Sequence, residues 1–171
     1  MESIKLRIIS VDDIPKLWDM AIAMGAGKAD GYFDRALEQQ EVGRRAVFIA
    51  EYEGRMCGYC MLAWEPKYAF FRKLGIPEIQ DLNVLPEFRR QGIGGCMIDH
   101  CENLAREKGC EYIGIGVGMD ASYGAAQRLY VVRGYVPDGN GLTYDRKAIP
   151  KGEFRPIDDD ISLMMIKDLQ I

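Results

Sequence analysis

The sequence is 171 residues long, 48% hydrophobic and 28% charged, which suits one globular domain that needs no disulfide or metal to hold its core. Its formal net charge of -4 argues against a protein that binds nucleic acid by neutralising phosphates. The N-terminal residues lack the basic and apolar pattern of a leader, and no window approaches the roughly 18 apolar residues of a membrane span. We therefore expect a single cytoplasmic domain covering residues 1–171, with neither a nucleic acid nor a membrane as partner.

The five cysteines are odd in number and lack the spacing of a disulfide framework, which is typical of reduced thiols. Cys57 and Cys60 form a C-x-x-C pattern, but the surrounding residues are typical of a strand. Residues three apart on a strand point to opposite faces, so the pair is expected to be two separate buried thiols and not a metal or redox site.

The first third of the chain predicts a strand and two helices. Residues 4–9 alternate as a half-buried strand does, and Ser10 or Asp12 can cap the helix that follows. The glycine-rich segment GAGKADG then interrupts the pattern, and a second helix is expected over residues 32–44. The apolar face of the first helix is expected to contain Ile14, Leu17, Trp18, Ala21 and Ile22.

The middle of the chain predicts a hairpin, a strand and a long helix. Two apolar runs joined at YEGR form the hairpin and end at Pro66, and a further strand is expected over residues 78–86. The helix over residues 92–108 should end at Gly109 and turn its charged residues largely outward. Those charged residues are Glu102, Arg106 and Glu107, and the buried face is expected to contain Ile93, Met97, Ile98, Cys101, Leu104 and Ala105.

The last third predicts a strand over residues 111–118 and a helix with Ala126, Leu129 and Tyr130 toward the interior. The DGNG segment is expected to be a turn, and the tail to contain a closing strand. Together these elements indicate a mixed α/β sheet with helices on both faces.

Three glycines within four positions open the long helix, although each glycine costs a helix roughly 1 kcal/mol relative to alanine. A tight turn between a strand and a helix directs unpaired backbone N–H groups to one point, where the helix dipole adds positive charge. Arg89 and Arg90 precede the turn and can add charged contacts. The segment lacks both the P-loop and the dinucleotide-binding spelling, but its pattern R-x-x-G-x-G predicts an anion site.

The segment DLNVLPEFRRQGIGGCMIDHCENLA resembles the acetyl-CoA motif of the GCN5-related N-acetyltransferase (GNAT) superfamily. In that motif a strand ends in Val-x-Pro and is followed by aromatic-Arg-x-x-Gly-x-Gly and a helix. The segment AAQRLYVVRGY resembles the second signature of the family. The two signatures and the order of the strands extend the resemblance over nearly the whole chain.

The resemblance implies a GNAT-type central sheet with splayed central strands and acetyl-CoA as cosubstrate, without a metal. Backbone amides of the glycine turn would bind the pyrophosphate, and main-chain groups around Leu82 and Val84 would hold the pantetheine arm. The family often has an asparagine where this chain has Tyr123, which departs from the pattern. The cofactor residues implied are Leu82, Val84, Arg89, Arg90, Gln91, Gly92, Ile93, Gly94 and Gly95.

Acetyl transfer to an amine needs a base for the ammonium proton, a donor to the thioester carbonyl and an acid for the leaving thiolate. Tyr130 occupies the Leu-Tyr position of the family signature and is the candidate acid, although a core aromatic is the alternative. Glu78 is the candidate base, because its spacing from Val84 matches the glutamate of the histone acetyltransferase branch. Asp81 and water are the alternatives to Glu78. Regular alternation places Asp81 on the opposite face of the strand from Glu78, but a bulge in the strand would change this.

The remaining candidates are weaker. His100 is expected to be structural, and the run from Asp158 to Asp160 a solvated turn, because nothing nearby supplies further metal ligands. The acceptor is expected to be a small-molecule amine or a peptide, bound near residues 24–40 and 135–147. The aromatics Trp64, Tyr68, Phe70 and Phe71 either line that pocket or pack in the core. A homodimer is possible, and a non-catalytic acyl-CoA sensor or a nucleotide-binding module are the competing functions.

Overall fold

The structure is a computed structural model that describes residues 3–170. The chain divides into two compact units. The first contains the residues up to Trp64 together with Gln80–Cys101, and the second contains Glu65–Ile79 together with the residues from Glu102 onward. The hydrogen-bonded strand order is β1-β2-β3-β4-β5-β8-β6-β7, so the fold is the mixed α/β class expected from the sequence.

The sheet of the first unit begins with β1 (Lys5–Ile8), which pairs antiparallel with β2 (Arg45–Tyr52). A hairpin joins β2 to β3 (Arg55–Ala63) through Glu53 and Gly54, which have φ of 52° and 72°. Positive φ at both central residues matches the twist of a tight hairpin. The expected hairpin is therefore confirmed.

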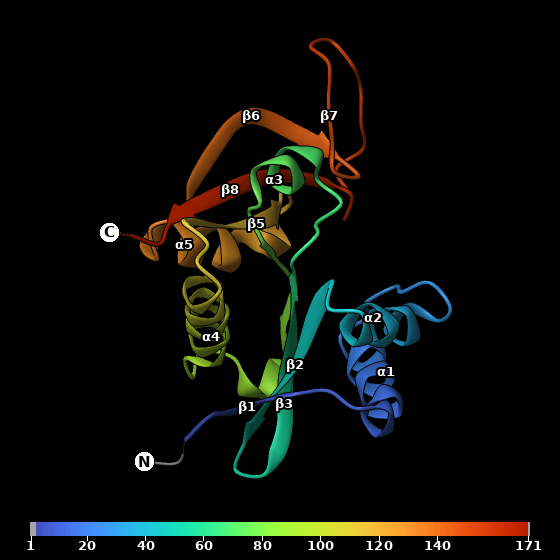
Figure 1. Cartoon of the computed structure of the whole chain (residues 1–171). Coiled ribbons are helices and arrows are strands. Elements are labelled where there is room, and N and C mark those ends of the chain that lie inside the picture. The colour runs from blue at the N-terminus through green and yellow to red at the C-terminus, as the bar shows by residue number, and fades with distance from the viewer. Residues whose placement is uncertain (1–2, 171) are drawn as a thin grey trace. The chain divides into compact units, whose positions relative to one another are not determined.

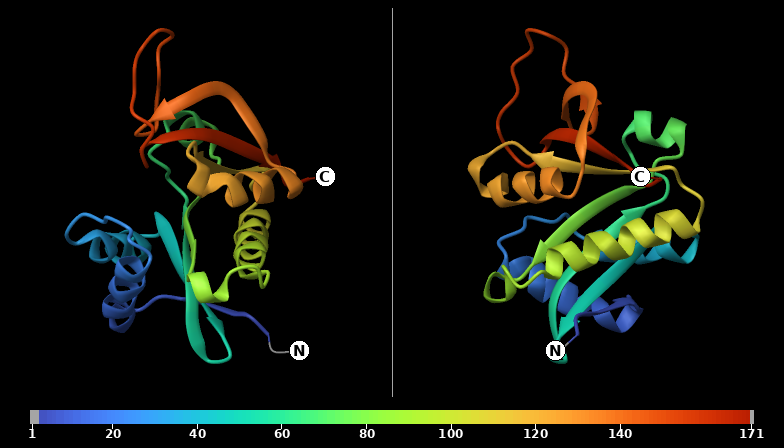
Figure 2. Two further views of the ribbon diagram at one scale, coloured as in Figure 1. Left: turned by 180° about the vertical axis from the view of Figure 1, so that it is seen from behind. Right: turned by 90° about the vertical axis from the view of Figure 1, so that its left-hand side faces the viewer.

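Helices cover both faces of this hairpin (Figures 1 and 2). On one face, α1 (Ile14–Ala23) and α2 (Tyr32–Glu41) contribute Leu17 and Phe33 to a core with Val47, Tyr59 and Met61. On the other face, the first turns of α4 (Ile93–Glu107) bring Cys101 Sγ to 4.0 Å from Cys60 Sγ and His100 edge-on to Phe48. Cys57 Sγ donates to the Ala50 carbonyl instead. Cys57 and Cys60 are both fully buried and bond to different partners, as expected for two separate thiols.

The second unit contains β5 (Tyr112–Gly118), β6 (Val136–Tyr144), β7 (Lys147–Ala148) and β8 (Ile161–Asp168). Strand β8 pairs antiparallel with both β5 and β6, and β6 pairs antiparallel with β7. The short helices α3 (Ala69–Leu74) and α5 (Gly124–Val132) and the 3-10 turn η3 (Ala121–Tyr123) also belong to this unit. Its sheet and helices can be followed by colour in Figure 2.

Strand β4 (Glu78–Val84) contributes residues to both units. Its parallel ladder with β5 consists of the pairs Glu78–Gly114 and Ile79–Ile115, only two residues of a seven-residue strand. A ladder this short is what splayed central strands require.

Two glycines of β5 lie beneath aromatic rings. A Cβ at Gly114 would sit 2.1 Å from the ring of Phe71, and one at Gly118 would sit 2.4 Å from the ring of Tyr123. Real Cβ atoms do not approach other heavy atoms this closely, so the two rings pack where side chains would otherwise stand.

The structure corrects four expectations. Ile22 is 71% exposed and Met20 is buried in its place, because the buried face of α1 turns at 100° per residue through Ile14, Leu17 and Ala21. Helix α2 ends at Glu41 and not at Arg44, since Gly43 adopts a φ of 74°.

The DGNG segment is not a turn between strands but an irregular stretch inside β6. Gly139 and Gly141 have φ of 87° and 76°, and the register with β8 shifts between Pro137 and Leu142. Glu102 is not outward but 2% exposed, because Lys167 Nζ and the Tyr135 hydroxyl donate to its two oxygens.

Candidate active site

The glycine turn (residues 89–95) follows β4 and the 3-10 turn η2 (Pro86–Phe88) and leads into α4. Arg90 and Gly92 both lie in the left-handed region, with φ of 63° and 82°. The first helical hydrogen bond runs from Cys96 N to the Gly92 carbonyl at 2.9 Å, so the amides just before it have no helical partner. The turn therefore has the backbone of an anion site at the start of a 15-residue helix.

Two contacts anchor the start of this turn within the first unit. Phe88 is 6% exposed and packs beneath the Arg55 guanidinium, which lies 4.9 Å from its ring centre. Arg89 Nε donates to the Val84 carbonyl at 3.0 Å, which joins the turn to the end of β4. A Cβ at Gly92 would meet nothing within 4 Å, so its left-handed backbone, and not crowding within the protein, selects glycine there.

Gly58 on β3 holds the backbone of β4 close. A Cβ at Gly58 would lie 2.5 Å from the Asn83 carbonyl oxygen, and Leu85 N donates to the Cys57 carbonyl at 2.9 Å. Leu82 and Val84, the expected ligands of the pantetheine arm, flank this close approach and are half-buried.

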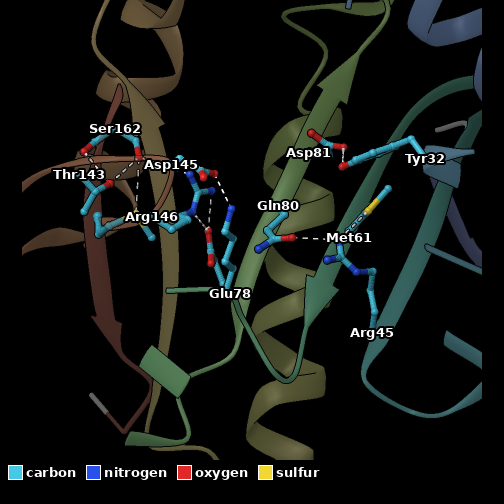
Figure 3. A network of polar contacts seen from close by, with 12 residues as sticks. Tyr32, Arg45, Met61, Glu78, Gln80, Asp81, Thr143, Asp145, Arg146 and Ser162 are labelled. Atoms are coloured by element: carbon cyan, nitrogen blue, oxygen red, sulfur yellow. Dashed lines mark hydrogen bonds and ion pairs between the residues drawn. The ribbon is translucent and has the colours of Figure 1, made fainter. Parts of the chain in front are cut away.

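The carboxylate of Glu78 is fully buried and bonds to one arginine. Arg146 Nε and Nη2 donate to Glu78 Oε1 at 2.9 and 2.7 Å, whereas Oε2 has no hydrogen-bond partner within the described residues (Figure 3). A buried carboxylate oxygen without a donor is costly, and this makes Glu78 a candidate for a functional role.

Further polar groups hold Arg146 in place. Its Nη1 donates to Ser162 Oγ at 3.3 Å, and Ser162 is bonded in turn to Thr143 Oγ1 at 3.0 Å (Figure 3). Asp145 and Arg146 form the two-residue turn between β6 and β7 with φ of 48° and 63°. Neither residue is glycine. Arg146 is held in this turn by its ion pair with the buried Glu78 carboxylate, and Asp145 forms an exposed ion pair with Lys67.

Asp81 interrupts the alternation of β4 with a φ of 50°. Its Oδ1 accepts from Lys28 Nζ at 2.8 Å and its Oδ2 from the Tyr32 hydroxyl at 2.5 Å. The simple rule that placed Asp81 opposite Glu78 assumes regular strand geometry, which this residue does not have.

Tyr130 is 5% exposed in α5, and its ring centre lies 6.1 Å from that of Tyr135. Burial raises the pKa of its hydroxyl well above the usual value, and the nearby Tyr123 adds to the shift. The phenol therefore stays protonated at neutral pH, as a general acid must. No hydrogen bond of this hydroxyl occurs within residues 3–170.

Tyr123, the residue that departs from the family pattern, has its ring against Gly118 and donates its hydroxyl to Asp159 at 3.1 Å. Tyr68 and Phe71 are core residues of the second unit, whereas Phe70 is 37% exposed. The β6–β7 hairpin and the residues that follow it form a hollow of about 380 Å³, lined by Tyr144, Asp145, Lys147, Ala148, Ile149, Arg155 and Asp160. No group of three or more potential metal ligands occurs in the described part of the chain.

Residues 16–135 match the Acetyltransferase (GNAT) family, which is most of the chain. The chain belongs to this family. Within residues 3–170, no helix of this GNAT protein is long and apolar enough to cross a membrane.

The GNAT chain is similar to two N-acetyltransferases whose names call them uncharacterized. It is 35% identical over 65 residues to one from Chlorobaculum tepidum, which covers 38% of this chain and 37% of that protein. It is 32% identical over 101 residues to one from Archaeoglobus fulgidus, which covers 58% of this chain and 63% of that protein. The matched regions thus span less than two thirds of either relative.

The fold is similar to that of a GNAT acetyltransferase from Elizabethkingia anophelis whose crystal structure contains acetyl-CoA. The TM-score is 0.65 at 18% identity, and the match covers 96% of this chain and 97% of that one. At this level of identity the likeness concerns the fold.

Two polar features of the GNAT chain were not expected from the sequence. Arg146 lies in a turn without glycine or asparagine, and only the adjacent aspartate is typical of such a position. Lys28 lies in a glycine-rich segment that carries no periodic pattern. Their partners lie 68 and 53 residues away along the chain, so only the folded structure brings them together.

Proposed function

We propose that this protein is an acetyl-CoA-dependent N-acetyltransferase that transfers an acetyl group to a primary amine of a small molecule or peptide by direct attack. The observation that supports this most strongly is the glycine turn, in which Arg90 and Gly92 adopt left-handed backbone at the start of α4 in a chain of the GNAT family. The acetyl-CoA in the similar Elizabethkingia protein agrees with the proposal.

In this proposal the amides from Gln91 to Gly95, with Ile93 and Gly94 between them, donate to the pyrophosphate. The exposed side chains of Arg89 and Arg90 add charge beside it. Main-chain groups around Leu82 and Val84 hold the pantetheine arm, and the Val84 N–H donates to the thioester carbonyl.

The chemistry is assigned to Glu78 and Tyr130. Oε2 of Glu78 is the free oxygen that accepts the ammonium proton, directly or through a water, and Arg146 keeps the other oxygen in place. The neutral amine then attacks the thioester carbon, the C–S bond breaks, and the protonated phenol of Tyr130 donates to the leaving thiolate. The nitrogen loses its second proton as the amide forms, and this proton returns to the Tyr130 phenolate directly or through water.

The decisive assay follows free thiol in mixtures of the protein, acetyl-CoA and a panel of polyamines, aminoglycosides and peptides. Thiol release that depends on an acceptor is expected. Binding of acetyl-CoA without such release identifies the competing function, a non-catalytic acyl-CoA sensor. Stabilisation by ATP equal to that by CoA identifies a nucleotide-phosphate module instead.

We further propose that the chain acts as one acetyltransferase domain in the cytoplasm, with neither a nucleic acid nor a membrane as partner, and that it can form a homodimer. The net charge of -4 supports the first of these exclusions. A single cooperative unfolding transition is expected for one domain, and sedimentation at several concentrations measures the oligomeric state.

A further inference from the structure

Asp81 is the centre of a small site within the first unit. Both oxygens of its carboxylate accept a hydrogen bond, one from Lys28 Nζ at 2.8 Å and one from the Tyr32 hydroxyl at 2.5 Å. The side chains of Lys28 and Asp81 are 17% and 18% exposed, so their ion pair is largely shielded from water.

Tyr32 contributes to this site twice. Its hydroxyl orients one carboxylate oxygen, and the face of its ring lies 4.7 Å from Lys28 Nζ. Burial, and then the charge of Asp81, raise the pKa values of Tyr32 and of nearby Tyr59, so both hydroxyls remain neutral around the carboxylate. One negative charge beside an aromatic face suits a compact primary ammonium.

Asp81 and Tyr32 lie in regular secondary structure, whereas Lys28 does not. Asp81 lies in β4 and Tyr32 in the first turn of α2, whereas Lys28 lies in the irregular connection between α1 and α2. Gly25 and Gly31 give that connection left-handed backbone, and a Cβ at Gly25 or Gly27 would meet nothing within 4 Å. The connection is therefore loosely packed around Gly25 and Gly27.

The backbone at Asp81 is strained, because a non-glycine residue at a φ of 50° costs about 1–3 kcal/mol. Such strain is found mostly at functional sites. Asp81 precedes Val84 by three residues, which is roughly 10 Å along a strand. The carboxylate thus belongs to the same strand and the same unit as the proposed thioester contact.

We propose that Asp81 and Tyr32 form a recognition site for a primary alkylammonium group, that Lys28 occupies this site in the free protein, and that an ammonium group of the acceptor, distinct from the amine that attacks, binds by displacing Lys28. The assignment of this ligand as the acceptor rests on the proposed acetyltransferase function. Exchange of one ammonium for another preserves the contacts of Asp81, so displacement costs mainly the reordering of residues 24–31.

The alternative is an ion pair that only fastens the connection between the helices. A rescue experiment separates the two, with butylammonium chloride as the probe. Lys28→Ala leaves Asp81 without its cation, and butylammonium should then raise the Tm by at least about 2 °C. Sodium chloride at equal ionic strength and butanol should have no such effect.

Two variants serve as controls. Lys67→Ala removes a lysine whose ion pair with Asp145 is exposed, and butylammonium should not rescue it. Lys28→Ala combined with Asp81→Asn should lose the rescue. An absent rescue in Lys28→Ala, or an equal one in either control, overturns the proposal.

A second measurement uses the unaltered protein and decides the matter if Lys28→Ala does not fold. Butylammonium should increase amide hydrogen exchange over residues 24–31, because these residues are released when Lys28 leaves. Unchanged or slower exchange there overturns the proposal. Neither readout uses acetyl-CoA, so a protein that shows rescue without acetyl transfer refutes the enzyme and retains the ammonium site.

Discussion

Both Nε and Nη2 of Arg146 donate to a single oxygen of Glu78, and the second oxygen of that fully buried carboxylate has no hydrogen-bond partner among residues 3–170. Arg146 is thus the counter-ion of the candidate base. The pair therefore matters both for the stability of the second unit and for the proposed chemistry.

Glu78→Gln should lower kcat by about 10²-fold or more and alter the rise of the rate with pH, since an amide cannot accept the proton. Glu102→Gln is the matched control, because Glu102 is also buried and paired with a cation but has no proposed role in transfer. Rate profiles of both variants are the measurement. A profile unchanged in Glu78→Gln assigns the base to Asp81 or to water.

Arg146→Met should lower the free energy of unfolding by about 3–5 kcal/mol, because it leaves a buried carboxylate without a partner. Arg146→Met combined with Glu78→Gln should recover part of that loss. Denaturant titration of the two single variants and the double variant measures the coupling. Additive losses would show that the two side chains do not depend on one another.

Gly92→Glu should abolish acetyl-CoA binding or raise its KM, because the side chain places bulk and negative charge where the pyrophosphate is expected. Gly109→Glu is the control at the other end of α4, where φ is 79° and a Cβ again meets nothing within 4 Å. Both variants carry the strain of left-handed backbone, roughly 1–2 kcal/mol. Calorimetric titration should show a binding defect in Gly92→Glu alone, and equal binding by both variants would remove the glycine turn from the site.

Tyr130→Phe should lower kcat by about 10²-fold while leaving the KM for acetyl-CoA nearly unchanged. Burial raises the pKa of Tyr130, so the phenol stays protonated into alkaline solution. Ionisation of Tyr130 should therefore not reduce kcat at any pH up to about 10. Tyr135→Phe is the control, because that hydroxyl bonds to Glu102 and should affect stability alone. Normal turnover in Tyr130→Phe would leave the residue as a core aromatic.

Asp13 should make the stability of the protein depend on acid pH. Hydrogen bonds from Arg7, followed by the Ser10 amide, lower the pKa of Asp13 below its usual range. Its stabilisation should be complete above the unfolded pKa near 4 and decline as the pH falls below that value. Asp13→Asn should therefore cost about 2 kcal/mol at pH 7 and progressively less in acid, as chemical unfolding at several pH values can test. A difference that does not depend on pH would contradict this origin.

The sequence was sufficient for most of the order of the elements, because helix periodicity, strand alternation and positive-φ glycines act over a few residues. It did not predict the short helix α3 or the strands β6 and β7. The same patterns failed at DGNG, where turn residues sit inside β6 as an irregularity, and at Glu102, whose burial depends on Lys167. The glycine turn could be found from sequence because its residues are adjacent. The contacts of Arg146 and Lys28 could not, since each depends on a partner more than 50 residues away.

The aromatic rings over β5 restrict how this sequence can change. Gly114 cannot acquire a side chain while Phe71 keeps its ring, and the same holds for Gly118 and Tyr123. The two residues of each pair should therefore change together, so that a larger residue on the strand is accompanied by a smaller one at the aromatic position. Among related chains, such paired exchanges at 71 with 114 and at 118 with 123 would reveal this constraint without any measurement on the protein itself.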